Sequence, residues 1–284
     1  MQARHEKVLY ENDKGQRVEI AYSFPFFFQQ LIGADGTNAE ITKTKSVGQD
    51  GSTIDNVSLT DRNLQILGVI KGQSKEEIAK YRAELLQVFN PKIRGWLQYE
   101  YGDVKRRIRC QVESAPKFTK KFTGYKYQDF LIDLLCPNPY WYDDFETSEE
   151  IVTWIGGMSF PLKLPTRFSM AGARIINIIN NGDVETPIKL EITGTATNPK
   201  VLNRSTGEFI KVNRVLTIDD TLIITTEFGN KRVELNNQNV FNYIDLNSTF
   251  LNLEIGDNVI ELTTENETDN ANVKIIFSNR YLGV

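Results

Sequence analysis

Histidine and cysteine, the side chains that most often bind metals or act as nucleophiles, are rare in this sequence. His5 is the only histidine among 284 residues, which excludes metal sites with two histidines and disfavours a Ser-His-Asp triad. The two cysteines, Cys110 and Cys136, are too few for a zinc ribbon or an iron–sulfur cluster. We expect both to be buried, reduced thiols, although a bond between them stays open.

No motif that carries a known reaction or cofactor compensates for this scarcity. The sequence has no phosphate-binding P-loop, no dinucleotide-binding glycine pattern, no HExxH and no GxSxG. The adjacent acids Asp143-Asp144 and Asp219-Asp220 could bind calcium or flank a glycosidic bond. Because neighbouring residues of a strand point to opposite faces, we interpret both pairs as solvated turns. The sequence therefore predicts neither a cofactor nor an enzyme.

A basic cluster lies in the run from Lys105 to Arg109. On a strand, Lys105, Arg107 and Arg109 share one face, while Arg106 lies on the other with Ile108. Such a face could contact phosphates or an acidic protein surface. It could equally be an exposed strand face that discourages edge-to-edge aggregation, which we favour over nucleic-acid binding. A contact between this face and another protein stays open.

An aromatic run forms the second candidate for an interface. Four of the five residues in Phe24–Phe28 are phenylalanines, and an extended segment cannot turn all of them toward one core. Phe26, Phe27 and Phe28 are therefore candidates for a second surface, in another layer of the same domain or in a neighbouring subunit. Burial in the core alone stays open as well, and we favour it over a subunit contact. Trp141 is a further candidate for such a contact.

Composition and charge indicate an ordinary globular chain made of two parts. Hydrophobic residues make up 40% and charged residues 25% of the sequence, so a core can form without metals or disulfides. Residues 1–142 hold 21 Lys and Arg against 17 Asp and Glu, whereas the remainder holds 12 against 20. This asymmetry suggests two units of different character. The charged N-terminus and the absence of a long apolar run predict no signal peptide and no membrane contact.

The elements of the first part are mostly strands, with one helix. Ser74 and Glu77 form a capping box before apolar residues at helical spacing, which predicts a helix that ends at Asn90-Pro91. The runs Trp96–Tyr101 and Val104–Val112 flank a Gly-Asp turn and predict a hairpin. Alternation over Phe130–Cys136 predicts a further strand.

The rest of the chain is predicted to be a connection followed by an all-β domain. Prolines, acids and aromatic residues mix in residues 143–172, which we interpret as an ordered strap. Short β-branched runs separated by Gly, Asn and Pro turns follow, as in a sandwich or jelly roll. The predicted domains are thus residues 1–142, the strap 143–172, and a β-sandwich over residues 173–284.

The succession of motifs resembles one known family. Leu31–Gly36 reads LIGADG, and the strand of Arg62–Gly72 leads into the helix. The most specific pieces are FNPKIRGWLQYEYGDVKRRIRCQVESAPKF at Phe89–Phe118 and the closing CPNPYW within Phe130–Asp143. Asn180–Val212 continues the likeness in the second half. This order of motifs is similar to that of the siphophage distal tail proteins, often called Dit proteins.

The resemblance implies an α+β, mainly β fold and a structural role. The N-terminal domain would be a split-barrel-like ring domain with one amphipathic helix, and the C-terminal domain a galectin-like sandwich. Six copies would form a hub ring at the phage tail tip, made in the host bacterial cytoplasm and carried in the virion. The ring would join the major tail tube protein to a tail-associated lysin or tip fibre. Receptor-binding or baseplate proteins could dock on it, and DNA would pass non-specifically through its lumen.

Two other functions stay open at this stage. The sandwich could bind cell-wall carbohydrate and act in host adhesion, with Phe228 and Tyr243 as candidate glycan contacts. Shape alone does not license sugar binding, because one fold serves many functions. An enzyme with an unrecognised carboxylate site is the third reading, disfavoured by the scarcity of histidine and of motifs.

Overall fold

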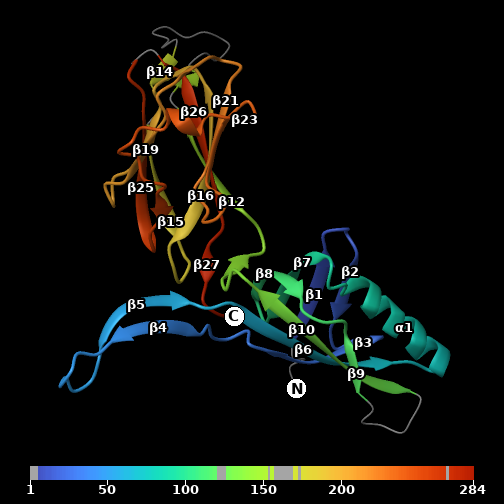
Figure 1. Ribbon diagram of the computed structural model, residues 1–284. Helices are drawn as coiled ribbons and strands as arrows, with labels where there is room; N and C mark the ends of the chain where they lie inside the picture. The colour runs from blue at the N-terminus through green and yellow to red at the C-terminus, as the bar shows by residue number, and fades with distance from the viewer. Residues whose placement is uncertain (1–5, 120–125, 153, 157–168, 172–173, 267–268) are drawn as a thin grey trace. The chain divides into compact units, whose positions relative to one another are not determined.

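A computed structural model describes residues 6–119, 126–152, 154–156, 169–171, 174–266 and 269–284, and strands dominate it, as predicted (Figure 1). The chain divides into two compact units. The first unit holds Met1–Asp144 together with Tyr281–Val284, and the second holds Phe145–Arg280.

The first unit is built on one antiparallel sheet in the order β2-β1-β7-β8-β10-β6-β3. Shorter strands extend it: β9 lies beside β10, and β11 lies beside β8 and β27. The predicted hairpin is confirmed as β7 and β8, with Tyr101 opposite Val104 at its turn. The strands are β1 (Glu6–Asn12), β2 (Arg17–Ile20), β3 (Phe26–Ile32), β6 (Arg62–Lys71), β7 (Arg94–Tyr101), β8 (Val104–Val112), β9 (Lys117–Thr119), β10 (Tyr127–Cys136), β11 (Trp141–Asp143) and β27 (Arg280–Tyr281).

This sheet closes on itself into a barrel that is split on one side. The end strands β2 and β3 meet where Ala21 N–H donates to Phe26 O (3.1 Å) and Phe28 N–H donates to Ala21 O (2.7 Å). Closure of this kind removes exposed sheet edges. Between β8 and β10, by contrast, the pairing is short: Leu134 lies opposite Val112, Leu135 lies opposite Gln111, and Glu113 N–H donates to Asp133 O (3.0 Å). We call this short pairing the β8–β10 seam.

The helix α1 (Lys75–Val88) packs its buried residues against this barrel. Its start matches the predicted capping box, since Glu77 N–H donates to Ser74 Oγ (3.3 Å). The Glu77 carboxylate reaches back one residue further than expected, to Gln73 N–H (2.8 Å). Leu85, Val88 and Phe89 lie in the core, which explains why the apolar residues recur at helical spacing.

A buried arginine joins three segments at one end of the first unit. Arg62 is 3% exposed and donates hydrogen bonds to five backbone carbonyl oxygens. The acceptors belong to the loop 33–36, to Pro139 after β10, and to Leu282 near the C-terminus. Their oxygens are those of Gly33 (2.6 Å), Ala34 (3.1 Å), Gly36 (3.1 Å), Pro139 (2.8 Å) and Leu282 (2.5 Å).

The last four residues, the C-terminal tail (residues 281–284), belong to the first unit. The Arg106 guanidinium lies 3.5 Å from the Tyr281 ring centroid and also donates to Gly283 O. A Cβ atom at Gly283 would lie 1.8 Å from Asp35 O, so this position accepts only glycine without a shift. The tail was expected to belong to the C-terminal domain, but it belongs to the first unit. Its contacts join residues far apart in the chain, and no sequence pattern predicts such contacts.

The second unit is a sandwich of two main antiparallel sheets. One has the order β12-β26-β16-β21-β22-β23 with β24 beside β16, and the other has the order β15-β25-β18-β19. Small pairs β13–β14 and β17–β20 and the 3-10 helix η1 complete it. The elements are β12 (Thr147–Val152), β13 (Trp154–Gly156), β14 (Ser169–Ala171), β15 (Ile175–Asn180), β16 (Thr186–Gly194), β17 (Ala196–Thr197), β18 (Lys200–Asn203), β19 (Phe209–Lys211), β20 (Val215–Leu216), β21 (Thr221–Thr225), β22 (Arg232–Leu235), β23 (Gln238–Asn239), η1 (Phe241–Tyr243), β24 (Asn252–Leu253), β25 (Gly256–Thr263) and β26 (Ala271–Phe277).

The predicted strap is described only in part. Its residues 147–152 form β12, which pairs with β26 from Thr147 opposite Phe277 to Val152 opposite Asn272. This part of the strap is therefore an integral strand of the second unit. Residues 153, 157–168 and 172 of the strap lie outside the described residues.

Replacing Arg62 by methionine should lower the free energy of unfolding of the first unit by about 3–5 kcal/mol, because several buried carbonyl oxygens lose their donor together. Urea unfolding followed by tryptophan fluorescence measures this, since Trp96 and Trp141 lie in the first unit. The matched control is Arg17→Met, whose side chain is exposed beside Glu11, with a change below about 1 kcal/mol. Equal effects of the two substitutions would contradict this assignment.

A second prediction concerns pH. Asp133 accepts from Lys117 Nζ (2.7 Å) and Gln65 Nε2 (2.8 Å), and the Lys117 hydrogen bond lowers the pKa of Asp133. A carboxyl with a lowered folded-state pKa adds stability above its unfolded pKa, and that stability is lost as pH falls through the folded value. Asp133→Asn should therefore destabilise the chain by about 1–3 kcal/mol at pH 7, and by progressively less as the pH falls below about 4. Urea unfolding at several pH values tests this, with the exposed Asp103→Asn as control; a pH-independent difference would refute it.

Candidate assembly surfaces

The aromatic run divides its side chains between the core and the surface. Phe26 and Phe28 are each 3% exposed and point into the barrel, where Phe26 meets Phe130 edge-on. Phe27 lies on the opposite face of β3 and is half-buried. Phe26 and Phe28 thus follow the favoured alternative of burial in the core, and they are no longer candidates for a partner contact because their surface is used within the barrel. Phe27 stays a candidate.

Trp141 is also a core residue rather than a contact residue. Its side chain is 0% exposed, and its Nε1–H donates to Ala34 O (3.2 Å). A buried indole needs such an acceptor, which the loop 33–36 supplies. The prediction of a subunit contact by Trp141 is corrected, since no part of the ring reaches the surface of the unit.

Phe27 lines a shallow apolar groove on the outside of the barrel. The groove has a volume of about 560 Å³, and the Lys71 ammonium lies 5.8 Å from the Phe27 ring centroid. Its walls are mostly apolar carbon, with one cation available at the rim. Such a groove suits an apolar side chain of another protein. The groove is lined by Phe27, Gln29, Val69, Lys71 and Tyr127.

The basic face of β8 carries its own compensating groups. The guanidinium groups of Arg107 and Arg109 lie 4.8 and 5.5 Å from the Trp96 ring centroid. Arg109 also pairs with Asp13 (2.6 Å), and its hydrogen bond lowers the pKa of Asp13. Because each cation already has an aromatic or acidic neighbour, the face attracts phosphate less than its three charges suggest.

Lys105, near the start of β8, also has an acidic neighbour. Its ammonium lies 3.1 Å from the Glu100 carboxylate on β7. A groove of about 560 Å³ borders the same face and has Trp96, Arg107 and Asp13 in its walls. The predicted sharing of one face by Lys105, Arg107 and Arg109 fits this arrangement, and their contact with a partner stays a prediction.

The most exposed element of the first unit is a hairpin that the sequence analysis did not predict. Strands β4 (Ala39–Thr44) and β5 (Thr53–Leu59) pair from Ala39 opposite Leu59 to Thr44 opposite Thr53. Nearly every residue of both strands is exposed, and Figure 1 shows the hairpin, which we call the arm, reaching beyond the barrel sheet. A signal for it in the sequence is Asp50-Gly51, a turn pair that lies between the two strands.

The arm also carries apolar side chains in water. Ile41 and Val57 lie directly opposite each other and are 51% and 55% exposed. Ile54 is likewise exposed. An isolated two-stranded hairpin is marginally stable in water and gains stability when one face packs on another surface. The arm is therefore the best candidate in this unit for a contact with another chain.

The two candidate glycan contacts of the sandwich lie in different turns. Phe228 is 94% exposed in the turn between β21 and β22. Tyr243 ends η1 and is half-buried beneath the Arg214 guanidinium, at 4.3 Å from the ring centroid. No described contact joins the two side chains. Their role in sugar binding stays a prediction.

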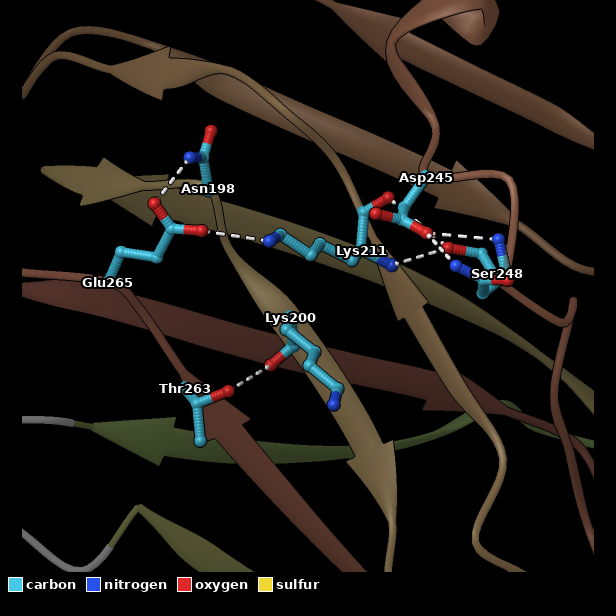
Figure 2. A network of polar contacts seen from close by, with 8 residues as sticks. Asn198, Lys200, Lys211, Asp245, Ser248, Thr263 and Glu265 are labelled. Atoms are coloured by element: carbon cyan, nitrogen blue, oxygen red, sulfur yellow. Dashed lines mark hydrogen bonds and ion pairs between the residues drawn. The ribbon is translucent and has the colours of Figure 1, made fainter.

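A polar cluster of the sandwich contains a serine, a lysine and acids, and its geometry is that of a tether (Figure 2). The Lys211 ammonium donates to Glu265 (2.8 Å), and this hydrogen bond lowers the pKa of Glu265. Ser248 Oγ accepts a hydrogen bond from the backbone N–H of Lys211 (3.0 Å). It therefore binds the main chain of Lys211 and not the side-chain ammonium. The cluster therefore links β19 to two neighbouring segments.

Two further features bear on site chemistry. Within the part of the chain that the structure describes, no three His, Cys, Asp or Glu side chains gather as metal ligands. Among the same residues, no helix is long and apolar enough to cross a membrane.

Comparison with known proteins gives two family matches, one in each unit. Residues 13–136 match the phage tail protein RIFT-related domain, and residues 181–281 match the siphovirus-type tail component, C-terminal domain. No curated protein matches the chain.

One solved structure shows the same fold over 97% of the chain. The crystal structure of the Dit protein (gp 19.1) of phage SPP1 is 17% identical, covers 97% of this chain and 99% of its own, and gives a TM-score of 0.71. It is described as a paradigm of the hub adsorption apparatus in phages that infect Gram-positive bacteria. Two activated baseplate structures of phage p2, with Ca and with Sr, are 15% and 14% identical. They cover 97% and 95% of this chain and 98% and 97% of their own, each with a TM-score of 0.49.

A split barrel followed by a β-sandwich, each matched by a phage tail family, defines a siphovirus-type tail component. More specifically, the chain belongs to the family of siphophage distal tail proteins, the Dit proteins. It is a structural component of the siphophage tail, and as a distal tail protein it belongs to the tail tip of the virion.

The division of the aromatic run can be tested with two neighbouring substitutions. Phe26→Ala should lower the free energy of unfolding by about 3–5 kcal/mol, because it leaves a cavity in the barrel core. Phe27→Ala, the matched control one residue away, should cost about 1 kcal/mol because its ring is already half in water. Urea unfolding monitored by tryptophan fluorescence measures both. A larger loss for Phe27 than for Phe26 would reverse the assignment.

Proposed function

We propose that six copies of this chain form a closed hub ring that joins the tail tube to the proteins of the tail tip. The observation that carries this proposal is the arm, which is exposed along its whole length and presents apolar side chains to water. In a ring with cyclic symmetry, each copy gives its arm to one neighbour and receives an arm from the other. Every arm is then covered, and no unmatched surface is left.

The closed barrel makes such a projecting element necessary. Because β2 and β3 complete the sheet, the barrel itself offers few free edges for strand pairing. Subunits must then associate through an added element or through side-chain surfaces such as the Phe27 groove. In this proposal the arm is the added element, and the Phe27 groove is the side-chain surface.

The proposed partners follow from the family's place in the tail. The major tail tube protein binds one side of the ring, and a tail-associated lysin or tip fibre binds the other. Receptor-binding or baseplate proteins dock at the periphery. DNA passes through the lumen without being read, which suits a basic strand whose charges are compensated by Asp13, Glu100 and Trp96.

Light scattering after size exclusion, over a series of concentrations, tests the ring directly. Six chains of 32.5 kDa should give a particle of about 195 kDa with six-fold symmetry in negative-stain images. Because ring closure can depend on a template, the same measurement is made with the major tail protein of the same phage present. A chain that remains monomeric in both conditions would rule out the ring.

The role of the arm is tested with the double variant Ile41→Asp, Val57→Asp. Two charges on the exposed apolar pair should prevent assembly, while the melting temperature of the monomer stays within about 2 °C because neither side chain is in the core. Ile218→Asp is the matched control, since Ile218 is 75% exposed in the second unit. Normal rings from the arm variant would show that another surface holds the subunits together.

A further inference from the structure

The two cysteines of the chain occupy facing positions across the β8–β10 seam. The register places Leu134 opposite Val112 and Leu135 opposite Gln111. The next position along both antiparallel strands is Cys136 on β10 and Cys110 on β8. Both side chains point into the same core, with exposures of 0% and 1%.

The spacing of facing residues suits a covalent bond between the sulfur atoms. Directly opposite residues of an antiparallel pair have Cα atoms about 4.5–5.5 Å apart, within the 4.4–6.8 Å range of natural disulfides. The two thiols form a side-chain hydrogen bond. This hydrogen bond, together with burial, raises the pKa of the Cys110 thiol. Both cysteines are free thiols in the structure.

We propose that Cys110 and Cys136 are a latent cross-strand disulfide that closes the β8–β10 seam under oxidising conditions. The bond would form at one end of the short β8–β10 pairing. Past Cys136 the chain continues with Pro137, which has no N–H to donate, so the backbone ladder cannot extend beyond this point. A disulfide would therefore join the two strands at the position where their hydrogen bonding stops.

The setting of the protein supplies both redox states. Thiols stay reduced in a bacterial cytoplasm, whereas released virions face an oxidising exterior. The chain would thus fold and assemble with a flexible seam and become locked after release. This inference concerns the barrel of a single subunit and does not depend on the proposed ring.

The reaction is an exchange with a low-molecular-weight disulfide such as oxidised glutathione. One cysteine thiolate attacks a glutathione sulfur, forms a mixed disulfide and releases one glutathione thiolate. The second cysteine thiolate then attacks the protein sulfur of that mixed disulfide and releases the second glutathione thiolate. The two cysteines lose two electrons to the glutathione disulfide, and their two protons end on the released thiolates.

Burial and a raised thiol pKa make this exchange slow in the closed barrel, because the thiolate is the nucleophile. The thiol–disulfide equilibrium must therefore be reached by letting the exchange proceed while the chain is unfolded or refolding. The full chain is refolded from urea in buffers with stepped ratios of oxidised to reduced glutathione, and a parallel series is equilibrated in urea. Alkylation, intact mass and a non-reducing peptide map then report the fraction of chains with a Cys110–Cys136 bond.

At the same glutathione ratio, the equilibrium ratio of disulfide to dithiol should be about 100-fold higher in the folded chain than in the unfolded chain. The reason is linkage: if the disulfide stabilises the fold, folding favours the disulfide to the same extent. The oxidised chain should also melt about 6–12 °C higher than the reduced chain, reversibly with reductant. Cys136→Ala is the matched control and should show neither effect.

Three results would overturn the proposal. Folding could leave the tendency to form the bond unchanged or lower it, the oxidised chain could fail to regain its native tryptophan fluorescence, or the cysteines could form bonds only between chains. Since the wild-type chain gives all of these readouts, the test holds even if Cys136→Ala folds poorly.

Discussion

The guanidinium group of Arg62 is the constraint on which the first unit depends. A charged group that is 3% exposed must have its donors satisfied, because an unpaired buried charge costs several kcal/mol. Arg62 meets this requirement with five backbone carbonyls. Carbonyls have fixed positions, so the arginine dictates where the loop 33–36, the turn at Pro139 and the C-terminal tail must lie. The Trp141 ring, 6.0 Å from the same guanidinium, packs against this arrangement.

This constraint also explains why the chain returns to its first unit. Leu282 supplies one of the acceptors, and Tyr281 and Gly283 bind Arg106 from the same tail. The two units are consequently connected at two points of the chain, after Asp144 and after Arg280. A domain connected once can be removed at its linker, whereas here truncation of the sandwich would remove an acceptor of Arg62. The first unit is therefore complete only when the last residues of the chain are present.

What could be predicted from the sequence was local. The capping box at Ser74 and the Gly-Asp turn of the β7–β8 hairpin act within a few residues, and both predictions were confirmed. Patterns of type and spacing could not tell which of the aromatic residues face inward: Phe26, Phe28 and Trp141 were candidates for an interface and lie in the core. The role of Arg62 and its contact with the C-terminal tail could not be predicted, because every residue has a backbone carbonyl and no sequence pattern shows which carbonyls accept from an arginine. The arm was missed because its two strands are mostly polar and carry no sustained alternation of apolar residues.

The same fold explains why rigidity and association reside in different elements. A barrel whose end strands meet has satisfied its backbone donors and acceptors, which makes it stiff but removes the edges that strands use to pair between molecules. An added hairpin resolves this conflict, because it can fold with its own register and still offer both faces to another chain. The split between β8 and β10 is the exception to closure, and it holds the two cysteines. The end of the β8–β10 seam is thus a place where a covalent bond could join the two strands without disturbing the arm.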